Sequence, residues 1–139
     1  MQQSQTSFSL STQGQGLYEF TREVSRWVAD SGIETGLLTL FCRHTSASLT
    51  IQENADPDVQ LDLNEFFARM VPEYMEWLRH TMEGPDDMPA HIKSALTDVS
   101  LSIPVANGRP TLGTWQGIYL FEHRKAPHNR SVVGHLIGD

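Results

Sequence analysis

The sequence lacks the usual features of secreted, membrane-spanning and nucleic-acid-binding proteins. Its 139 residues include a single cysteine, Cys42, so no disulfide can form within the chain. The first residues have neither the basic start nor the apolar block of a signal peptide, and no apolar run approaches the length of a membrane span. The net charge of −7 argues against a phosphate backbone as the main partner. We therefore expect a cytoplasmic protein with neither a membrane nor a nucleic-acid partner.

Motifs of common nucleophile and nucleotide sites are also absent. The chain has no Gly-x-Ser-x-Gly elbow, no Walker A segment and no Gly-x-Gly-x-x-Gly fingerprint. No internal repeat is visible, and the length suits one domain over residues 1–139. Cys42 closes an apolar run, which favours a buried small hydrophobe over a nucleophile.

The first half of the chain alternates between strand and helix patterns. Residues 7–11 alternate apolar and serine side chains, as in a half-buried strand. A helical spacing then runs from Leu17 to Val28, and Ser31-Gly32 supplies a stop. The nearly continuous apolar run at 36–43 predicts a strand buried on both faces, and residues 46–52 predict a further strand.

The second half predicts two helices followed by strands. Asp56-Pro57-Asp58 starts a helix with one apolar face, and Pro89 starts another that ends near Leu96. Asn107-Gly108 is a turn signal that we interpret as a hairpin leading into the strand at 115–121. Further strands are expected at 99–103 and 130–137. This order predicts an α+β fold with mainly antiparallel pairing.

Three histidines lie at the ends of predicted elements, where functional groups concentrate. They are His44, His80 and His91. Three neutral imidazoles and a water make an open zinc site. However, no pair has the spacing of a zinc finger or of His-Glu-x-x-His, and three unrelated histidines are the alternative.

Charged segments leave further alternatives. Residues 52–58 can cap the following helix or hold a hydrated divalent cation. Asp86-Asp87 is a solvated turn, a pair that orients an imidazole, or a magnesium ligand pair. Lys93 either is solvated or reaches an anion near a helix N-terminus.

The late strand offers fewer chemical candidates. Trp115 can be a core residue or a platform for a cofactor. Gln116 needs a hydrogen-bond partner if it is buried. Glu122-His123-Arg124 and Arg130 read as a charged rim at the strand ends.

Three segments, taken in order, resemble those of a known family. His44-Thr45-Ser46-Ala47-Ser48-Leu49-Thr50 leads into Glu53-Asn54-Ala55-Asp56-Pro57. Asp86-Asp87-Met88-Pro89-Ala90-His91-Ile92-Lys93-Ser94 follows, and then Gly113-Thr114-Trp115-Gln116-Gly117-Ile118 with Glu122-His123-Arg124. Over almost the whole chain this pattern is similar to the YjbQ family, also named secondary thiamine-phosphate synthases. Residues 124–130 depart from the glycine-rich turn of many members.

The resemblance implies a fold, an assembly and a set of site residues. Members are compact α+β homotrimers thought to bind a metal through histidines, and zinc is favoured here over magnesium. The implied metal ligands are His44, His80 and His91. The implied catalytic residues are Glu53, Asp87, Lys93, Gln116 and Glu122, and the implied substrate-binding residues are Thr45, Asn54, Lys93, Trp115 and Arg130.

The resemblance also implies a reaction with a small phosphorylated substrate. The enzyme would join a pyrimidinylmethyl diphosphate to a thiazole phosphate and release diphosphate. Two alternatives stay open. One is a metal-dependent hydrolase of a phosphorylated or acyl substrate. The other is a non-catalytic trimer that binds a metal or a ligand.

Overall fold

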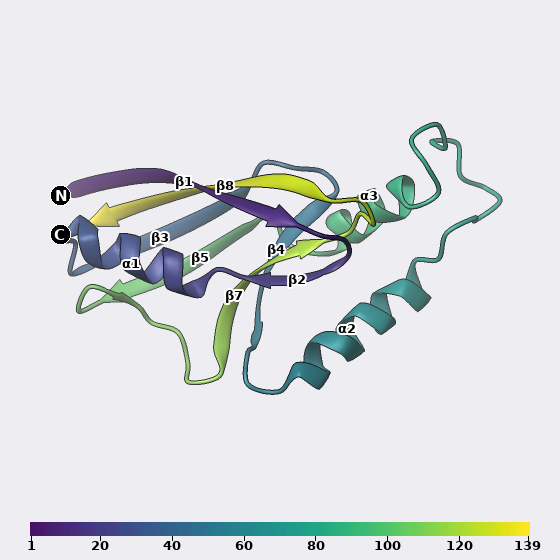
Figure 1. Ribbon diagram of the computed structural model, residues 1–139. Helices are drawn as coiled ribbons and strands as arrows, with labels where there is room; N and C mark the ends of the chain where they lie inside the picture. The colour runs from purple at the N-terminus through teal and green to yellow at the C-terminus, as the bar shows by residue number, and fades with distance from the viewer.

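Two antiparallel sheets form the framework of the chain, and the computed structural model describes all residues from Met1 to Asp139 (Figure 1). The five-stranded sheet has the order β1-β8-β3-β5-β6, and the three-stranded sheet has the order β2-β7-β4. The strands are β1 (Gln2–Thr12), β2 (Gly16–Glu19), β3 (Thr35–Cys42), β4 (Ala47–Glu53), β5 (Ser100–Ala106), β6 (Arg109–Pro110), β7 (Gln116–Glu122) and β8 (His128–Gly138). The helices are α1 (Thr21–Ser31), α2 (Pro57–Met70) and α3 (Asp87–Leu96). The expected α+β fold with antiparallel pairing is confirmed.

One hydrophobic core joins the two sheets and α1. Val24 and Val28 of α1 are buried against the inner face of the five-stranded sheet. The three-stranded sheet adds Leu49 and Leu120 to the same core. Cys42 is buried within it, as the sequence predicts for a small hydrophobe. No helix is long and apolar enough to cross a membrane.

The strand β3 is buried on one face only, which corrects the prediction of burial on both faces. Leu38 and Leu40 are buried, whereas Leu37 and Phe41 are 44% and 49% exposed. No element of the chain covers the outer face of this sheet, so the outward half of the apolar run lies open. Residues opposite in register extend this apolar strip, which we define as Leu37, Phe41, Pro104, Val133 and Ile137.

One boundary and one pairing also differ from the sequence predictions. Leu17 belongs to β2, and α1 begins only at Thr21, although Gly32 ends it in the left-handed conformation as expected. Asn107 and Gly108 do form a turn with positive φ, but the hairpin joins β5 to the two-residue β6. The strand β7 lies in the other sheet, between β2 and β4. The predicted hairpin into 115–121 is therefore wrong.

The helix α2 begins as predicted but buries less than its sequence indicates. The Asp56 side chain accepts a hydrogen bond from the Asp58 N–H at 2.9 Å, so capping is confirmed for this segment. No residue of α2 is buried, and Leu61 is 63% exposed. Phe67 meets Phe121 edge to face, with ring centroids 5.3 Å apart. Figure 1 shows α2 at the margin of the molecule, followed by a segment that reaches away before α3.

Candidate functional site

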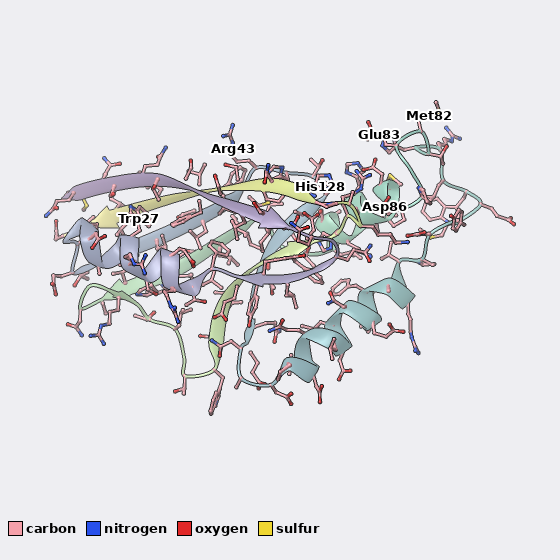
Figure 2. The ribbon with its side chains drawn as sticks, in the orientation of Figure 1. Trp27, Arg43, Met82, Glu83, Asp86 and His128 are labelled. Atoms are coloured by element: carbon pink, nitrogen blue, oxygen red, sulfur yellow. The ribbon has the colours of Figure 1, made fainter.

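The start of α3 and the segment before it bring His80, Asp87 and His91 together. One possible ligand atom of each lies within 4.8 Å of the others. Asp87 and His91 are one helical turn apart and so share a face of α3. Figure 2 shows the neighbouring Asp86 near the strand ends, with Met82 and Glu83 farther out in the preceding segment.

Hydrogen bonds fix the orientation of the two imidazoles. His80 Nε2 lies 2.7 Å from Asp87 Oδ2, and His91 Nε2 lies 3.3 Å from the same oxygen. His91 Nδ1 donates to the Thr45 carbonyl at 2.9 Å. A neutral His91 ring therefore carries its proton on Nδ1 and turns the Nε2 lone pair towards a carboxylate oxygen. Only a proton or a cation between Nε2 and the carboxylate offsets the repulsion between them. Metal-bound histidines commonly donate their other ring N–H to a backbone carbonyl, as His91 does here.

Asp87 is held in place by Arg124. Arg124 Nη1 donates to Asp87 Oδ1 at 2.7 Å, while its Nε donates to Asp86 Oδ2 at 2.9 Å. Burial opposes ionisation of Asp87, but the hydrogen bond from His80 and the charge of Arg124 hold its pKa below the ordinary value. The ionised carboxylate thus has one oxygen occupied by Arg124 and the other turned to the imidazoles.

The donor set fits a transition metal better than magnesium. Two imidazole nitrogens and one carboxylate oxygen form the ligand set of many catalytic zinc sites, which keep one position open. Magnesium prefers oxygen ligands alone. The side chains of His80 and His91 are 49% and 30% exposed, whereas that of Asp87 is 3% exposed. The cluster is therefore accessible from solvent and anchored on a buried carboxylate.

His44 lies outside this cluster. Its Nε2 accepts a hydrogen bond from the Ser131 N–H at 2.8 Å, which links the β3–β4 connection to β8. Burial, followed by the charge of Arg130, lowers the pKa of His44, so its ring is neutral with the proton on Nδ1. Neither nitrogen offers a free lone pair in this arrangement. The structure thus gathers two of the three predicted histidines, and Asp87 is the third donor.

Glu122 and Arg130 form a buried ion pair and not the solvated rim that their sequence positions indicate. Glu122 is fully buried, and Arg130 Nε donates to its Oε1 at 2.7 Å. Thr12 and the N–H groups of His123 and Arg124 also donate to this carboxylate. Burial opposes ionisation, but the hydrogen bonds from Arg130 and Thr12 hold the pKa of Glu122 below its ordinary value.

The donors around Glu122 occupy both of its oxygens. Arg130 Nη2 also reaches Ser46 Oγ at 3.0 Å, on the connection that carries Thr45. These contacts make the pair a support for the cluster. The catalytic role of Glu122 and the substrate-binding role of Arg130 stay predictions.

Four other predicted site residues lie at the opposite end of the β4–β7 ladder. Six residue steps separate the Ala47–Glu122 and Glu53–Gln116 pairs, which is about 20 Å along a strand. There the Asn54 side chain donates to Glu19, and Gln116 accepts from the Gly113 N–H. Within one chain the structure does not bring these residues to the cluster. They are Glu53, Asn54, Trp115 and Gln116.

Lys93 points away from the cluster on another side of α3. It is 6% exposed and lines a cavity beneath α2. Its predicted roles in catalysis and substrate binding therefore concern a place separate from the histidines.

Sequence reasoning missed the part played by Arg124. The segment Glu122-His123-Arg124 is visible as a charged group, but Arg124 and Asp87 are 37 positions apart. No local pattern connects them, since only the tertiary fold brings the β7–β8 connection, which carries Arg124, to the start of α3.

Comparisons with known proteins agree on one family. A family profile described as "UPF0047 protein YjbQ-like" matches residues 6–139. The chain is 56% identical to the UPF0047 protein sll1880 of Synechocystis, over 99% of this chain and 93% of the relative. It is 44% identical to the UPF0047 protein YjbQ of Escherichia coli, over 97% of this chain and 98% of that relative.

Solved structures support the same assignment. An uncharacterized conserved protein of the YjbQ/UPF0047 family from Clostridium acetobutylicum superposes with a TM-score of 0.86. The two chains are 37% identical, and the match covers 95% of this chain and 99% of that one. A conserved hypothetical protein from Thermus thermophilus is similar, with a TM-score of 0.85 and 36% identity over 95% of this chain and 99% of that one.

Proposed function

Because the chain belongs to the UPF0047, YjbQ-like family, we propose that it is a metal-dependent cytoplasmic enzyme whose site is the His80–Asp87–His91 cluster. One observation carries the proposal. His91 Nδ1 is committed to the Thr45 carbonyl, so Nε2 faces Asp87 Oδ2 at 3.3 Å, an arrangement that a bound cation stabilises.

The metal in this proposal is zinc or a similar transition metal, favoured over magnesium because two of the three donors are imidazoles. When bound, it supplies positive charge for the phosphate oxygens of a substrate. The residues of the chain have separate tasks. Asp87 anchors the cluster, Arg124 keeps Asp87 ionised, and the Thr45 carbonyl fixes the His91 tautomer.

The reaction that the family resemblance implies is synthesis of thiamine phosphate. The C–O bond of a pyrimidinylmethyl diphosphate breaks, diphosphate leaves with the electron pair, and the nitrogen of a thiazole phosphate forms the new C–N bond. Such a step requires charge stabilisation on the leaving group. A cation held by the accessible imidazoles and Asp87 would supply that charge.

Hydrolysis of a phosphorylated or acyl substrate is the second candidate. Half of the His80 side chain is exposed, so water has direct access to the cluster. A site that faces water is better suited to hydrolysis than to a reaction that must exclude it. The two candidates share the cluster and differ in the product formed.

We also propose that the chain assembles as a homotrimer. The exposed apolar strip on the five-stranded sheet, Leu37, Phe41, Pro104, Val133 and Ile137, supports this proposal, because uncovered apolar strips of this kind mark protein contacts.

The catalytic proposal is tested by incubating the purified protein with the two thiamine precursors and measuring thiamine phosphate. We expect product with the wild type and loss of most of the rate in His91→Ala. His128→Ala is the matched control, because the only hydrogen bond of the His128 side chain goes to the Ala126 carbonyl. Figure 2 shows the position of His128. Equal rates in wild type and His91→Ala would refute the site. Hydrolysis of the diphosphate precursor without coupling would favour the second candidate.

A further inference from the structure

A small apolar pocket lies directly beside the histidine cluster. It is formed by the segment 71–86, which reaches away between α2 and α3 in Figure 1, and by the start of α3. Its volume is about 210 Å³. The segment contributes Tyr74, Met75 and Leu78, and α3 contributes Met88 and Pro89. No acidic residue, lysine or arginine lines this pocket, so its wall is largely apolar.

His80 belongs to both the pocket and the cluster. It lines the pocket, while its Nε2 lies 2.7 Å from Asp87 Oδ2. A group in the pocket and a group at the cluster therefore contact the same residue, and one molecule can occupy both places.

Lys125 connects the two walls of the pocket. Its ammonium pairs with Glu73, the residue before Tyr74. Its backbone N–H donates to Asp86 Oδ2 at 2.9 Å, at the start of α3. Val71 is buried and anchors the beginning of the segment. The pocket is thus formed before any ligand binds, as most small-molecule sites are.

Tyr74 lies at the rim of the pocket and has a strained backbone. Its φ of 59° falls in the left-handed region, which bulky residues rarely adopt. The residue is 79% exposed, so burial of its ring does not offset the strain. Strain of this kind clusters at ligand-binding sites. An exposed aromatic ring at the rim of an apolar pocket can pack on a second ring inside it.

We propose that this pocket binds the uncharged ring of a small substrate, while the cluster binds the phosphate to which that ring is joined. The inference rests on the proposed function, because it places the phosphate at the His80–Asp87–His91 cluster. A cavity of about 150 Å³ is large enough for benzene, so the pocket suits a single ring with small substituents. Its two methionines adapt to different ring shapes.

The apolar wall also defines the substrate class. It would leave the hydroxyl groups of a sugar without hydrogen-bond partners, which is unfavourable. The class is therefore a phosphate or diphosphate ester of a ring-bearing methanol and not a sugar phosphate.

The test compares benzyl phosphate with methyl phosphate in calorimetric titrations of the purified, zinc-loaded full-length protein. The two probes carry the same anion and differ only in the ring. We expect benzyl phosphate to bind at least about tenfold more tightly, because apolar ring surface leaves water. Leu78→Asn, which nearly keeps the side-chain volume, should remove most of this preference and retain the metal content. Trp77→Asn is the matched control, because Trp77 is 70% exposed and does not line the pocket.

Tyr74→Gly separates the contact with the ring from the stability of the fold. Glycine adopts a positive φ without strain, so the free energy of unfolding should not fall. The preference for benzyl phosphate should fall, because the aromatic ring at the rim is lost.

A second readout does not depend on the metal. In protein labelled at its methionine methyl groups, benzyl alcohol carries the ring without the phosphate and should shift the signals of Met75 and Met88. Met1 and Met82 are 85% and 94% exposed outside the pocket, and their signals should stay unchanged.

The two readouts distinguish failure of the pocket from failure of the metal site. Shifts at Met75 and Met88 in a protein that takes up no metal would support the pocket and refute the proposed function. Equal affinity for the two phosphates, an equal loss of preference in Leu78→Asn and Trp77→Asn, or no shift at Met75 and Met88 would overturn the inference.

Discussion

Asp87 is the residue on which the cluster depends. One of its oxygens accepts from Arg124 and the other faces both imidazoles, although the side chain is almost fully buried. Sequence alone offered Asp87 as a solvated turn residue, an imidazole partner or a magnesium ligand. The structure favours a role for Asp87 as the partner of the two imidazoles. Its side chain is buried and one oxygen is bonded to Arg124, so the other oxygen can face only His80 and His91.

His123 should make stability depend on pH. Its folded pKa is about 3, against an ordinary value of 6.5, because burial and then the charge of Lys93 oppose protonation. Between these values the unfolded chain binds a proton that the folded chain does not. The stability from this residue is therefore complete above pH 6.5 and falls as pH drops, by about 1.4 kcal/mol per pH unit.

Urea unfolding between pH 7 and pH 5 measures this slope. We expect His123→Asn to flatten it, with a residual slope of the same sign from His44, whose pKa is also lowered. A slope unchanged by His123→Asn would contradict the account of this buried ring.

At the scale of elements, the Glu122–Arg130 pair joins β7 to β8 and holds the β3–β4 connection through Ser46. Arg130→Met should destabilise the fold by about 3–5 kcal/mol, because it leaves a buried carboxylate without its counter-charge. Arg69→Met is the control: it removes an exposed ion pair with Glu65 and should cost about 0.5 kcal/mol or less.

Denaturant unfolding of both variants at neutral pH gives the comparison. If the free energy of unfolding falls by the same small amount in both variants, the buried ion pair contributes no more to stability than a surface pair does.

The sequence predicts where most helices and strands lie, but it does not predict which strands pair with one another. Side-chain alternation located the strands at 7–11 and 99–103, and Asp56-Pro57 located the start of α2. Asn107-Gly108 defined a turn, but a turn fixes only local geometry and does not select the sheet that the next long strand joins. The apolar run of β3 gave no indication that its outer half stays open, because hydrophobicity does not distinguish a core from a contact with another chain.

The candidate site could likewise be predicted only in part. Local motifs and family resemblance indicated His80, Asp87 and His91. They did not reveal that Arg124 holds Asp87, nor that the Trp115 and Gln116 segment lies at the other end of a ladder. Those relations depend on how distant strands pack, which short-range patterns do not encode.

At the scale of the whole molecule, the open sheet face should determine assembly. Light scattering during size-exclusion chromatography should give a mass three times that of the 15.6 kDa chain. Phe41→Glu places a charge in the apolar strip and should shift the mass towards a single chain. Ala29→Glu, on the exposed side of α1, should leave it unchanged. A wild-type monomer, or a Phe41→Glu trimer, would contradict the proposed role of this face.

The central claim is that His80, Asp87 and His91 bind a metal, and metal analysis of untagged protein tests it most directly. The wild type and the His128→Ala control should carry close to one transition-metal ion per chain. His91→Ala should lose most of it, because the remaining imidazole and carboxylate form an incomplete set. A wild type that takes up no metal, or a His91→Ala protein that keeps full occupancy, would contradict the account.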